Sequence, residues 1–237
     1  MDKGTPVKVQ TQELSPTQAC IGRFEVRLKA DRFKLMAPSA VQGYLEEKRD
    51  KNKGVRVVKG ARRFYVVDGH HTLSAVMEAQ APRELILDQV DDLSDSGSKE
   101  EFWKKMGKRG LYYPRRLGQA TSPSDFPPTL DELEDDAFRS LAWLLRKMNA
   151  FEDLKEPYQE FKIADFLRQY MAFEPQAPHE YELAALRAFE LLRSEEAERA
   201  VDQGELPGVE KGASKPKDLL AQYYEVLADA RAPRYYQ

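Results

Sequence analysis

The chain has 237 residues, of which 41% are hydrophobic and 32% charged, and this balance predicts a globular protein rather than a disordered or membrane-embedded one. No apolar run is long enough to span a bilayer, and residues 1–8 lead into no secretory signal, so a cytoplasmic location is expected. The single cysteine, Cys20, excludes an intrachain disulfide and a zinc site built on several thiolates.

The net charge of −3 conceals two halves of opposite sign. Residues 1–116 carry 23 Lys and Arg against 16 Asp and Glu, whereas residues 117–237 carry 14 against 24. The basic first half is compatible with an anionic ligand. The net negative charge of the whole chain argues against unaided, non-specific binding to duplex DNA.

The first half alternates strand-like and helix-like segments. Strands are predicted at 7–12, 55–58, 64–67 and 84–90. Helices are predicted at 22–36, from Pro38 to the charged run that begins at residue 46, and from residue 73 to 79. The strands at 55–58 and 64–67 flank a short turn and predict a hairpin. These elements predict a mixed α/β unit of three or four strands.

The second half is predicted to be helical. One short helix is expected at 98–106, before a long connection rich in Gly, Pro and Ser. Thr129 and Glu132 have the spacing of a capping box and predict that a helix begins there. Further helices are predicted near 157–171, 179–201 and 215–230. The predicted fold class is α+β, with an α/β domain at 1–116 and a helical domain at 117–237 that packs on it or follows it.

Residues 66–74, VVDGHHTLS, hold two of the three histidines in the chain. A glycine between a strand and a helix permits a tight turn, and the first N–H groups of the helix can then hold phosphate. Histidine at this place can donate hydrogen bonds to phosphate, transfer protons or bind a metal. The alternative is that Asp68 caps the helix and both histidines are partly buried polar residues.

The stretch VVDGHHTLSAVMEA resembles the helix-start signature of the ParB/sulfiredoxin superfamily, and it is most similar to the branch labelled putative ParB-like nucleases. In that pattern Gly69 takes the glycine, His71 the histidine that sulfiredoxin carries, and Ala75 the small helical residue. Thr72 stands where ParB and sulfiredoxin have arginine. Threonine carries no positive charge, so it does not supply a cation that binds phosphate at this position.

A second stretch, LSPTQACIGRFEVRLK at 14–29, resembles the early motif of the same branch. The resemblance implies that Gln18, Arg23, Glu25 and Lys29 lie near the phosphate-binding helix start. It also implies a ParB/sulfiredoxin-like fold for the first half. A sulfiredoxin activity is not expected, because His70 stands where sulfiredoxin has its cysteine.

The resemblance implies a nucleotide-binding enzyme, because relatives bind ATP or CTP phosphates at this helix start. The expected activity is phosphotransfer or phosphohydrolysis, as in a kinase or an NTPase. Gly69, His70, His71 and Thr72 are expected to bind the phosphates, with Gln18, Arg23 and Lys29 beside them. His70 and His71 are expected to stabilise charge or shuttle protons, and Glu25 or Asp68 to act as base and to bind Mg²⁺.

Two other functions stay open. The first is a metal-dependent nuclease, in which the six cations between Lys104 and Arg116 contact nucleic acid. No acidic residue lies between 102 and 116. The alternative for this segment is a solvated linker. The second is a non-catalytic module that binds a nucleotide, or a protein partner through the helical half. The aromatic residues at 150–174 are most simply core, and a partner groove is the alternative.

Overall fold

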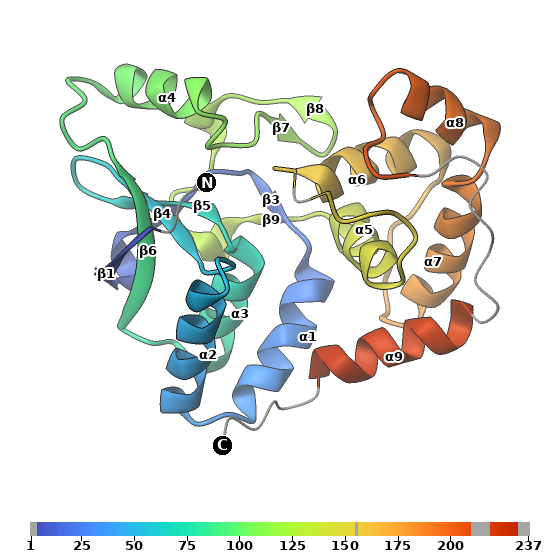
Figure 1. The fold of residues 1–237 in the computed structure, drawn as a ribbon, viewed down its shortest axis with the longest axis horizontal. Helices are drawn as coiled ribbons and strands as arrows, with labels where there is room; N and C mark the ends of the chain where they lie inside the picture. The colour runs from blue at the N-terminus through green and yellow to red at the C-terminus, as the bar shows by residue number, and fades with distance from the viewer. Residues whose placement is uncertain (1–3, 155, 210–218, 232–237) are drawn as a thin grey trace. The chain divides into compact units, whose positions relative to one another are not determined.

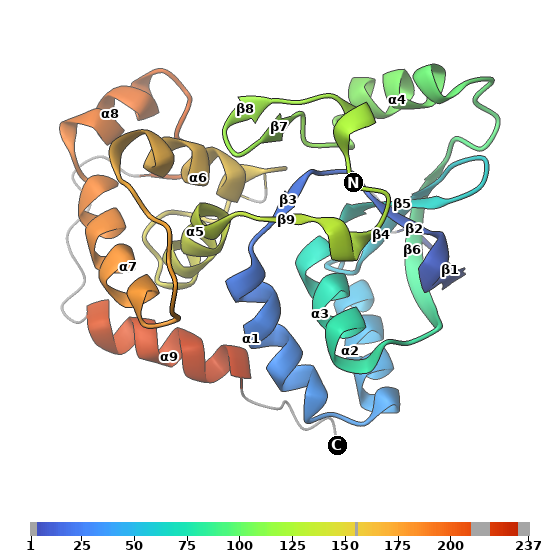
Figure 2. The ribbon, with the colours of Figure 1, turned by 180° about the vertical axis from the view of Figure 1, so that it is seen from behind.

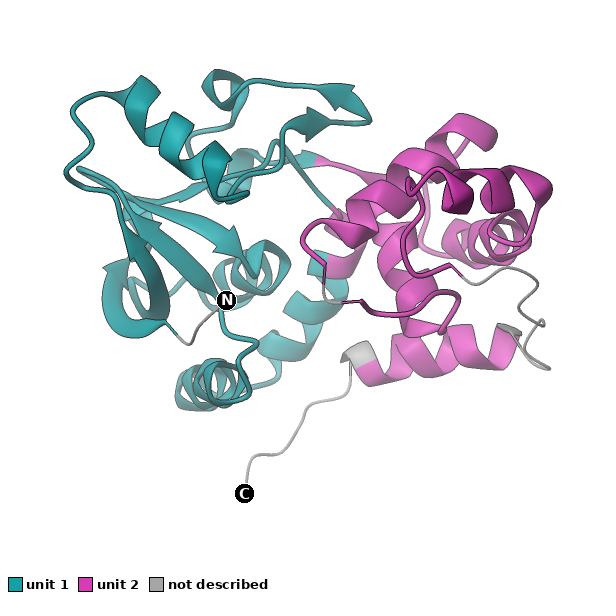
Figure 3. Cartoon of the chain, turned by 45° about the horizontal axis from the view of Figure 1, so that its top comes forward, with its two compact units in different colours: residues 1–21, 26–134, 232–237 teal, residues 22–25, 135–231 magenta. Residues whose placement is uncertain are grey.

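The computed structural model describes residues 4–154, 156–209 and 219–231 (Figures 1 and 2). These residues form two compact units, shown in teal and magenta in Figure 3. The sheet unit consists of residues up to 21 together with 26–134, and the helical unit consists of residues 22–25 together with 135–231. Residues 117–134, which the sequence grouped with the helices, therefore lie in the sheet unit.

The sheet unit is built on five strands in the order β1-β6-β4-β5-β2. Their bounds are β1 Thr5–Gln10, β2 Leu14–Pro16, β4 Arg56–Lys59, β5 Phe64–Asp68 and β6 Glu84–Asp92. Strand β1 pairs antiparallel with β6, and β4 pairs antiparallel with β5. The β4–β6 and β5–β2 pairs are parallel. The sheet is therefore mixed.

Three helices cover one face of this sheet and one helix covers the other, as both ribbon views show (Figures 1 and 2). The bounds are α1 Arg23–Lys34, α2 Pro38–Asp50 and α3 His70–Gln80 on the first face, and α4 Lys99–Lys108 on the second. Val57 and Val66 are register partners that enter the core under α1–α3. Their neighbours Val58 and Tyr65 pack with α4, because successive strand residues point to opposite faces.

The predicted elements of the sheet unit are largely confirmed, including the hairpin of β4 and β5 and the helix that begins at Pro38. The predicted number of three or four strands is wrong, since the sheet has five. The added strand, β2, has only three residues and ends in Pro16 at the sheet edge. Proline is tolerated at an edge, and three residues are too few to show an alternating pattern.

The helical unit contains five helices among its described residues. They are α5 Ala137–Lys147, α6 Gln159–Tyr170, α7 Glu180–Leu191, α8 Glu195–Asp202 and α9 Leu219–Arg231. The helix predicted at 179–201 is interrupted, because the Ser194 side chain accepts a hydrogen bond from the Ala197 N–H (3.4 Å) and caps a new helix. Residues 215–218 of the last predicted helix lie outside the described residues.

The prediction that a helix begins with a capping box at Thr129 is wrong. Leu130–Glu132 form only a short 3-10 turn, η3, and Thr129 Oγ1 donates to Glu132 Oε1 (2.7 Å) rather than capping a backbone group. Leu130 and Leu133 are drawn into the core of the sheet unit. Helix α5 begins only at Ala137, where Asp136 Oδ1 accepts from the Arg139 N–H (3.1 Å).

The remaining elements are short. They are strands β3 Cys20–Ile21, β7 Arg115–Arg116, β8 Gln119–Ala120 and β9 Glu134–Asp135, with 3-10 turns η1 Thr11–Glu13 and η2 Pro123–Asp125. The predicted α+β class, a small mixed-sheet domain followed by helices, is confirmed. Cys20 is buried, with 2% of its surface exposed. Within the described ranges, no helix combines the length and apolarity needed to cross a membrane.

Candidate functional site at the start of helix α3

Gly69 forms the turn between β5 and α3. Its φ of +85° lies in the left-handed region, where side chains are strained. A Cβ atom at this position would lie 2.9 Å from Val55 Cγ2 and 3.0 Å from Val55 Cα, so there is no room for one. The conformation and the space therefore both require glycine here.

The N-cap residue of α3 supplies no side-chain cap. Gly69 itself is the N-cap residue, and Asp68 stands before it and accepts a hydrogen bond from the Gly69 N–H through Oδ1 (2.8 Å). The alternative interpretation, in which Asp68 caps the helix, stays open beside the phosphate site. The first N–H groups of a helix have no intrahelical partner and carry the positive end of the helix dipole, so this end can bind an anion.

His70 ties α3 to the end of strand β2. Its Nε2 accepts a hydrogen bond from the Thr17 N–H (3.3 Å), while Thr17 Oγ1 donates to the Val66 carbonyl (2.7 Å). In this arrangement His70 Nε2 acts as a hydrogen-bond acceptor. Only 4% of His70 and 8% of His71 is exposed. Both histidines are therefore buried, and the Nε2 atom of His70 is engaged by the Thr17 N–H.

The sheet unit also holds three other residues that the sequence associated with the phosphates. Gln18 is buried, and its Nε2 donates to the Cys20 carbonyl (2.7 Å). Thr72 and Lys29 are half-buried. Arg23 belongs instead to the helical unit, where its backbone N–H donates to Asp135 Oδ1 (2.9 Å).

Glu25 also belongs to the helical unit, and it takes part in a buried chain of charges. Its carboxylate lies 3.3 Å from Arg139 Nη1, and 4% of its side chain is exposed. Arg139 also pairs with Glu160, whose other oxygen lies 2.5 Å from Arg146 Nε. Burial alone would raise the pKa of Glu160, but the two guanidinium groups outweigh it and hold that pKa below its ordinary value.

The two carboxylates that the sequence associated with Mg²⁺ belong to different units, and their role as metal ligands stays a prediction. Asp68 lies in the sheet unit and Glu25 in the helical unit. Among the described residues, no three His, Cys, Asp or Glu side chains are close enough together to hold a metal ion. A divalent cation near α3 would have to take most of its ligands from a bound phosphate and from water.

Three of the six cations in the segment from Lys104 to Arg116 are paired with carboxylates. Lys105 pairs with Glu101 (3.0 Å), Arg109 with Asp91 (3.2 Å) and Arg116 with Glu134 (2.6 Å). Lys104 and Lys108 are exposed on α4 and form no ion pair within 4.0 Å in the part of the chain that the structure describes. The sixth cation, Arg115, donates through Nε to the Gly118 carbonyl (3.2 Å). Lys104 and Lys108 are therefore the two cations best suited to contact a phosphate backbone.

The sequence did not predict two residues that contact candidate site residues, namely Thr17 beside His70 and Arg139 beside Glu25. Thr17 lies in the quoted Pro-Thr-Gln group, so the motif contained a signal, but its contact with His70 spans 53 residues. The pairing of Glu25 with Arg139 spans 114 residues and has no local signal.

Comparisons with known proteins agree with this fold. The chain is similar to the crystal structure of protein Atu1540 from Agrobacterium tumefaciens, with 29% identity, a TM-score of 0.69, and coverage of 88% of this chain and 100% of that chain. No curated protein sequence matches the chain. A family model described as "putative ParB-like nuclease" matches residues 7–169, which is well over half of the chain and includes the start of α3. The protein therefore belongs to this ParB-like nuclease family.

Proposed function

We propose that the protein binds a nucleoside triphosphate, ATP or CTP, with its phosphates at the start of α3, and that it transfers or hydrolyses a phosphoryl group. The observation that carries this proposal is the left-handed Gly69 at the N-cap, which has no side chain to occupy the positive end of the helix. A buried histidine pair directly after it supplies further donors.

Each residue has a separate role in this proposal. The N–H groups at 70–72 and the Thr72 hydroxyl hold phosphate oxygens, which stabilises developing negative charge. Thr17 fixes the orientation of His70, and His71 stabilises charge or moves a proton. Asp68 is the favoured base because it is exposed and directly precedes the phosphate site, whereas Glu25 is engaged by Arg139. A Mg²⁺ ion would arrive with the nucleotide.

Isothermal titration with ATP, CTP, GTP and UTP, with and without Mg²⁺, tests this proposal. We expect one nucleotide to bind, and we expect replacement of both His70 and His71 by alanine to weaken that binding about tenfold or more, since hydrogen bonds to charged groups are lost. His179→Ala is the matched control, because it removes the third histidine, which is exposed in the helical unit. Absence of binding by all four nucleotides would contradict the proposal, and binding without turnover would indicate a non-catalytic module.

Family membership and the two exposed lysines on α4 favour a second candidate, a nuclease that contacts nucleic acid through Lys104 and Lys108. If this is correct, Lys104→Ala with Lys108→Ala should reduce the slope of log K against log salt by about 1.4 for single strands. Lys105→Ala should leave the slope unchanged, because Glu101 already neutralises that charge. Fluorescence anisotropy with labelled single strands at several salt concentrations measures the slope, and equal effects of all three lysines would contradict this role for α4.

A further inference from the structure

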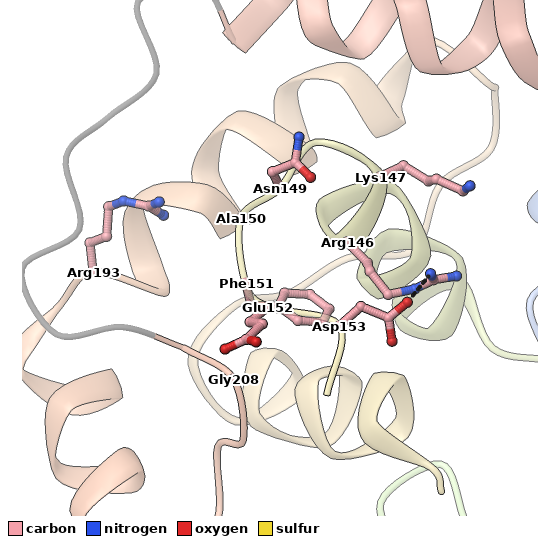
Figure 4. A pocket seen from close by; sticks show the side chains of 9 residues that line it. All are labelled: Arg146, Lys147, Asn149, Ala150, Phe151, Glu152, Asp153, Arg193 and Gly208. Carbon is pink, nitrogen blue, oxygen red and sulfur yellow. Dashed lines mark hydrogen bonds and ion pairs between the residues drawn. The ribbon is translucent and has the colours of Figure 1, made fainter. Parts of the chain in front are cut away.

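A cavity of about 600 Å³ lies within the helical unit, where α5 ends (Figure 4). Arg146 in its lining is paired with Asp153 (3.2 Å), and Figure 4 shows Lys147 directed away from Arg193. The lining therefore offers no converging set of charged groups to a ligand. Helix α4 of the sheet unit, in contrast, combines half-buried aromatic rings with exposed lysines.

The chain turns back on itself at the end of α4. Gly110 has a left-handed φ of +64°, and its N–H donates to the Gly107 carbonyl (3.0 Å). The Leu111 N–H donates to the Met106 carbonyl (3.0 Å), and both of these residues enter the same hydrophobic cluster. Two such bonds with an apolar contact form a Schellman motif, which ends the helix and brings the next residue, Tyr112, back against it.

The ring of Tyr112 packs against the backbone of α4. A Cβ atom at Gly107 would lie 3.1 Å from Tyr112 Cε1 and 3.2 Å from its hydroxyl oxygen, so the glycine makes room for the ring. Trp103 meets the ring edge-on, with 5.7 Å between ring centroids, and Phe126 lies 5.9 Å away. These contacts fix the orientation of Tyr112 before any ligand binds, which lowers the entropic cost of binding.

Of the two neighbouring tyrosines, Tyr112 is the one that solvent can reach. Tyr113 is only 6% exposed, and its N–H donates to the Thr17 carbonyl (3.0 Å). Tyr112 is half-buried, as is Trp103 behind it. A partner that stacks on an aromatic ring at this end of α4 would therefore meet Tyr112.

Lys104 and Lys108 lie beside this aromatic pair. They directly follow Trp103 and Gly107 in the sequence, and each pair is four residues apart, so the two pairs form neighbouring stripes on α4. Both lysines are exposed, and they lie about 6 Å apart along the helix axis. The Tyr112 ring, which contacts Gly107, is therefore flanked by two positive charges.

The acidic residue on the stripe of Lys104 and Lys108 is Glu100, in the first turn of α4. Hydrogen bonds to its own backbone N–H and to Ser98 lower the pKa of its carboxyl group, so this charge is engaged at the N-terminus of the helix. The end of α4 that carries Tyr112 therefore presents positive charge, which complements phosphate.

We propose that Tyr112 stacks on a base of a single-stranded nucleic acid while Lys104 and Lys108 contact the neighbouring phosphates. This inference rests on the second candidate function, to which it adds a base contact on the same helix. Every base has an aromatic face, and phosphate contacts carry no sequence information, so little sequence preference is expected. A duplex keeps its bases stacked inside, so it is not expected to use Tyr112.

Three strands of equal length test the proposal by fluorescence anisotropy: oligothymidine, oligouridine and an abasic DNA strand. At least one of the two strands with bases is expected to bind about tenfold more tightly than the abasic strand. Tyr112→Leu should remove this advantage and leave the abasic strand unaffected, whereas Tyr112→Phe should keep it. Tyr170→Leu is the matched control, because Tyr170 is 45% exposed but lies in the helical unit.

Tryptophan fluorescence of the unaltered chain keeps the test decisive if Tyr112→Leu does not fold. The chain has two tryptophans, and Trp143 is only 2% exposed, so Trp103 is the one placed to report on a base at Tyr112. The strands with bases should quench its emission to saturation, and the abasic strand should not. Equal affinity for all three strands, or equal quenching by them, would overturn the base contact alone. Absence of binding by every strand would overturn it together with the second candidate function.

Discussion

Replacing Arg139 with methionine is expected to lower the free energy of unfolding by about 3–5 kcal/mol. The change leaves the carboxylates of Glu25 and Glu160 buried without the guanidinium that both contact. Methionine keeps an unbranched side chain at this position but removes the guanidinium that lies 5.3 Å from the centre of the Phe161 ring. Chemical denaturation of the full chain, monitored by circular dichroism, measures the difference.

The pH dependence and two control variants separate this effect from lost packing. In the native protein the pKa of Glu160 is lowered, so its contribution to stability is present at neutral pH and is lost as the pH falls through the unfolded value toward the lower native one. In Arg139→Met the destabilisation should therefore be smaller at pH 4.5 than at pH 7. Adding Glu25→Gln and Glu160→Gln should restore part of the stability, and Arg199→Met, at an exposed ion pair, should cost less than about 1 kcal/mol. An effect that is equal at both pH values would contradict the argument.

Gly69→Ala is expected to lower the free energy of unfolding by about 2–4 kcal/mol, from the positive φ and from overlap with Val55. Because the same residue forms the turn into α3, the variant should also lose nucleotide binding under conditions in which it remains folded. Thermal denaturation and titration of the same preparation measure the two effects.

Gly43→Ala is the matched control for this change. Gly43 lies inside α2, and a Cβ atom there would have no heavy atom within 4 Å. Alanine is favoured over glycine in a helix interior, so this variant should be more stable by about 0.5–1 kcal/mol. If Gly69→Ala were as well tolerated as Gly43→Ala, the turn would not need glycine and the geometric basis of the proposed phosphate site would fail.

The motif around the histidine pair illustrates how far the sequence leads. The order of strand, glycine and helix predicted that α3 begins directly after Gly69, and the structure has this arrangement. The partner of His70 is a different matter: its Nε2 accepts from the Thr17 N–H, and Thr17 follows strand β2, which pairs in parallel with β5. The role of His70 at the phosphates stays a prediction. The sequence motif does not show whether the Nε2 atom of this histidine accepts a hydrogen bond, although its chemistry depends on that bond.

Glu25 shows the same limit more strongly. The sequence associates it with the phosphates through the early motif, and that role stays a prediction. The structure pairs it with Arg139 in the helical unit, although most of helix α1 belongs to the sheet unit. No pattern of apolar residues within α1 indicates which distant arginine its first turn contacts.

The sequence by itself determined the local elements: the strands around the hairpin, the helices with clear apolar periodicity, the turn at Gly69, and the family to which residues 7–169 belong. These features depend on backbone preferences and side-chain spacing among near neighbours. The tertiary structure alone decided the short edge strand β2, the displaced start of α5, and the partners of His70 and Glu25. Each of these depends on contacts between residues far apart in the chain, where packing and long-range hydrogen bonds outweigh local preference.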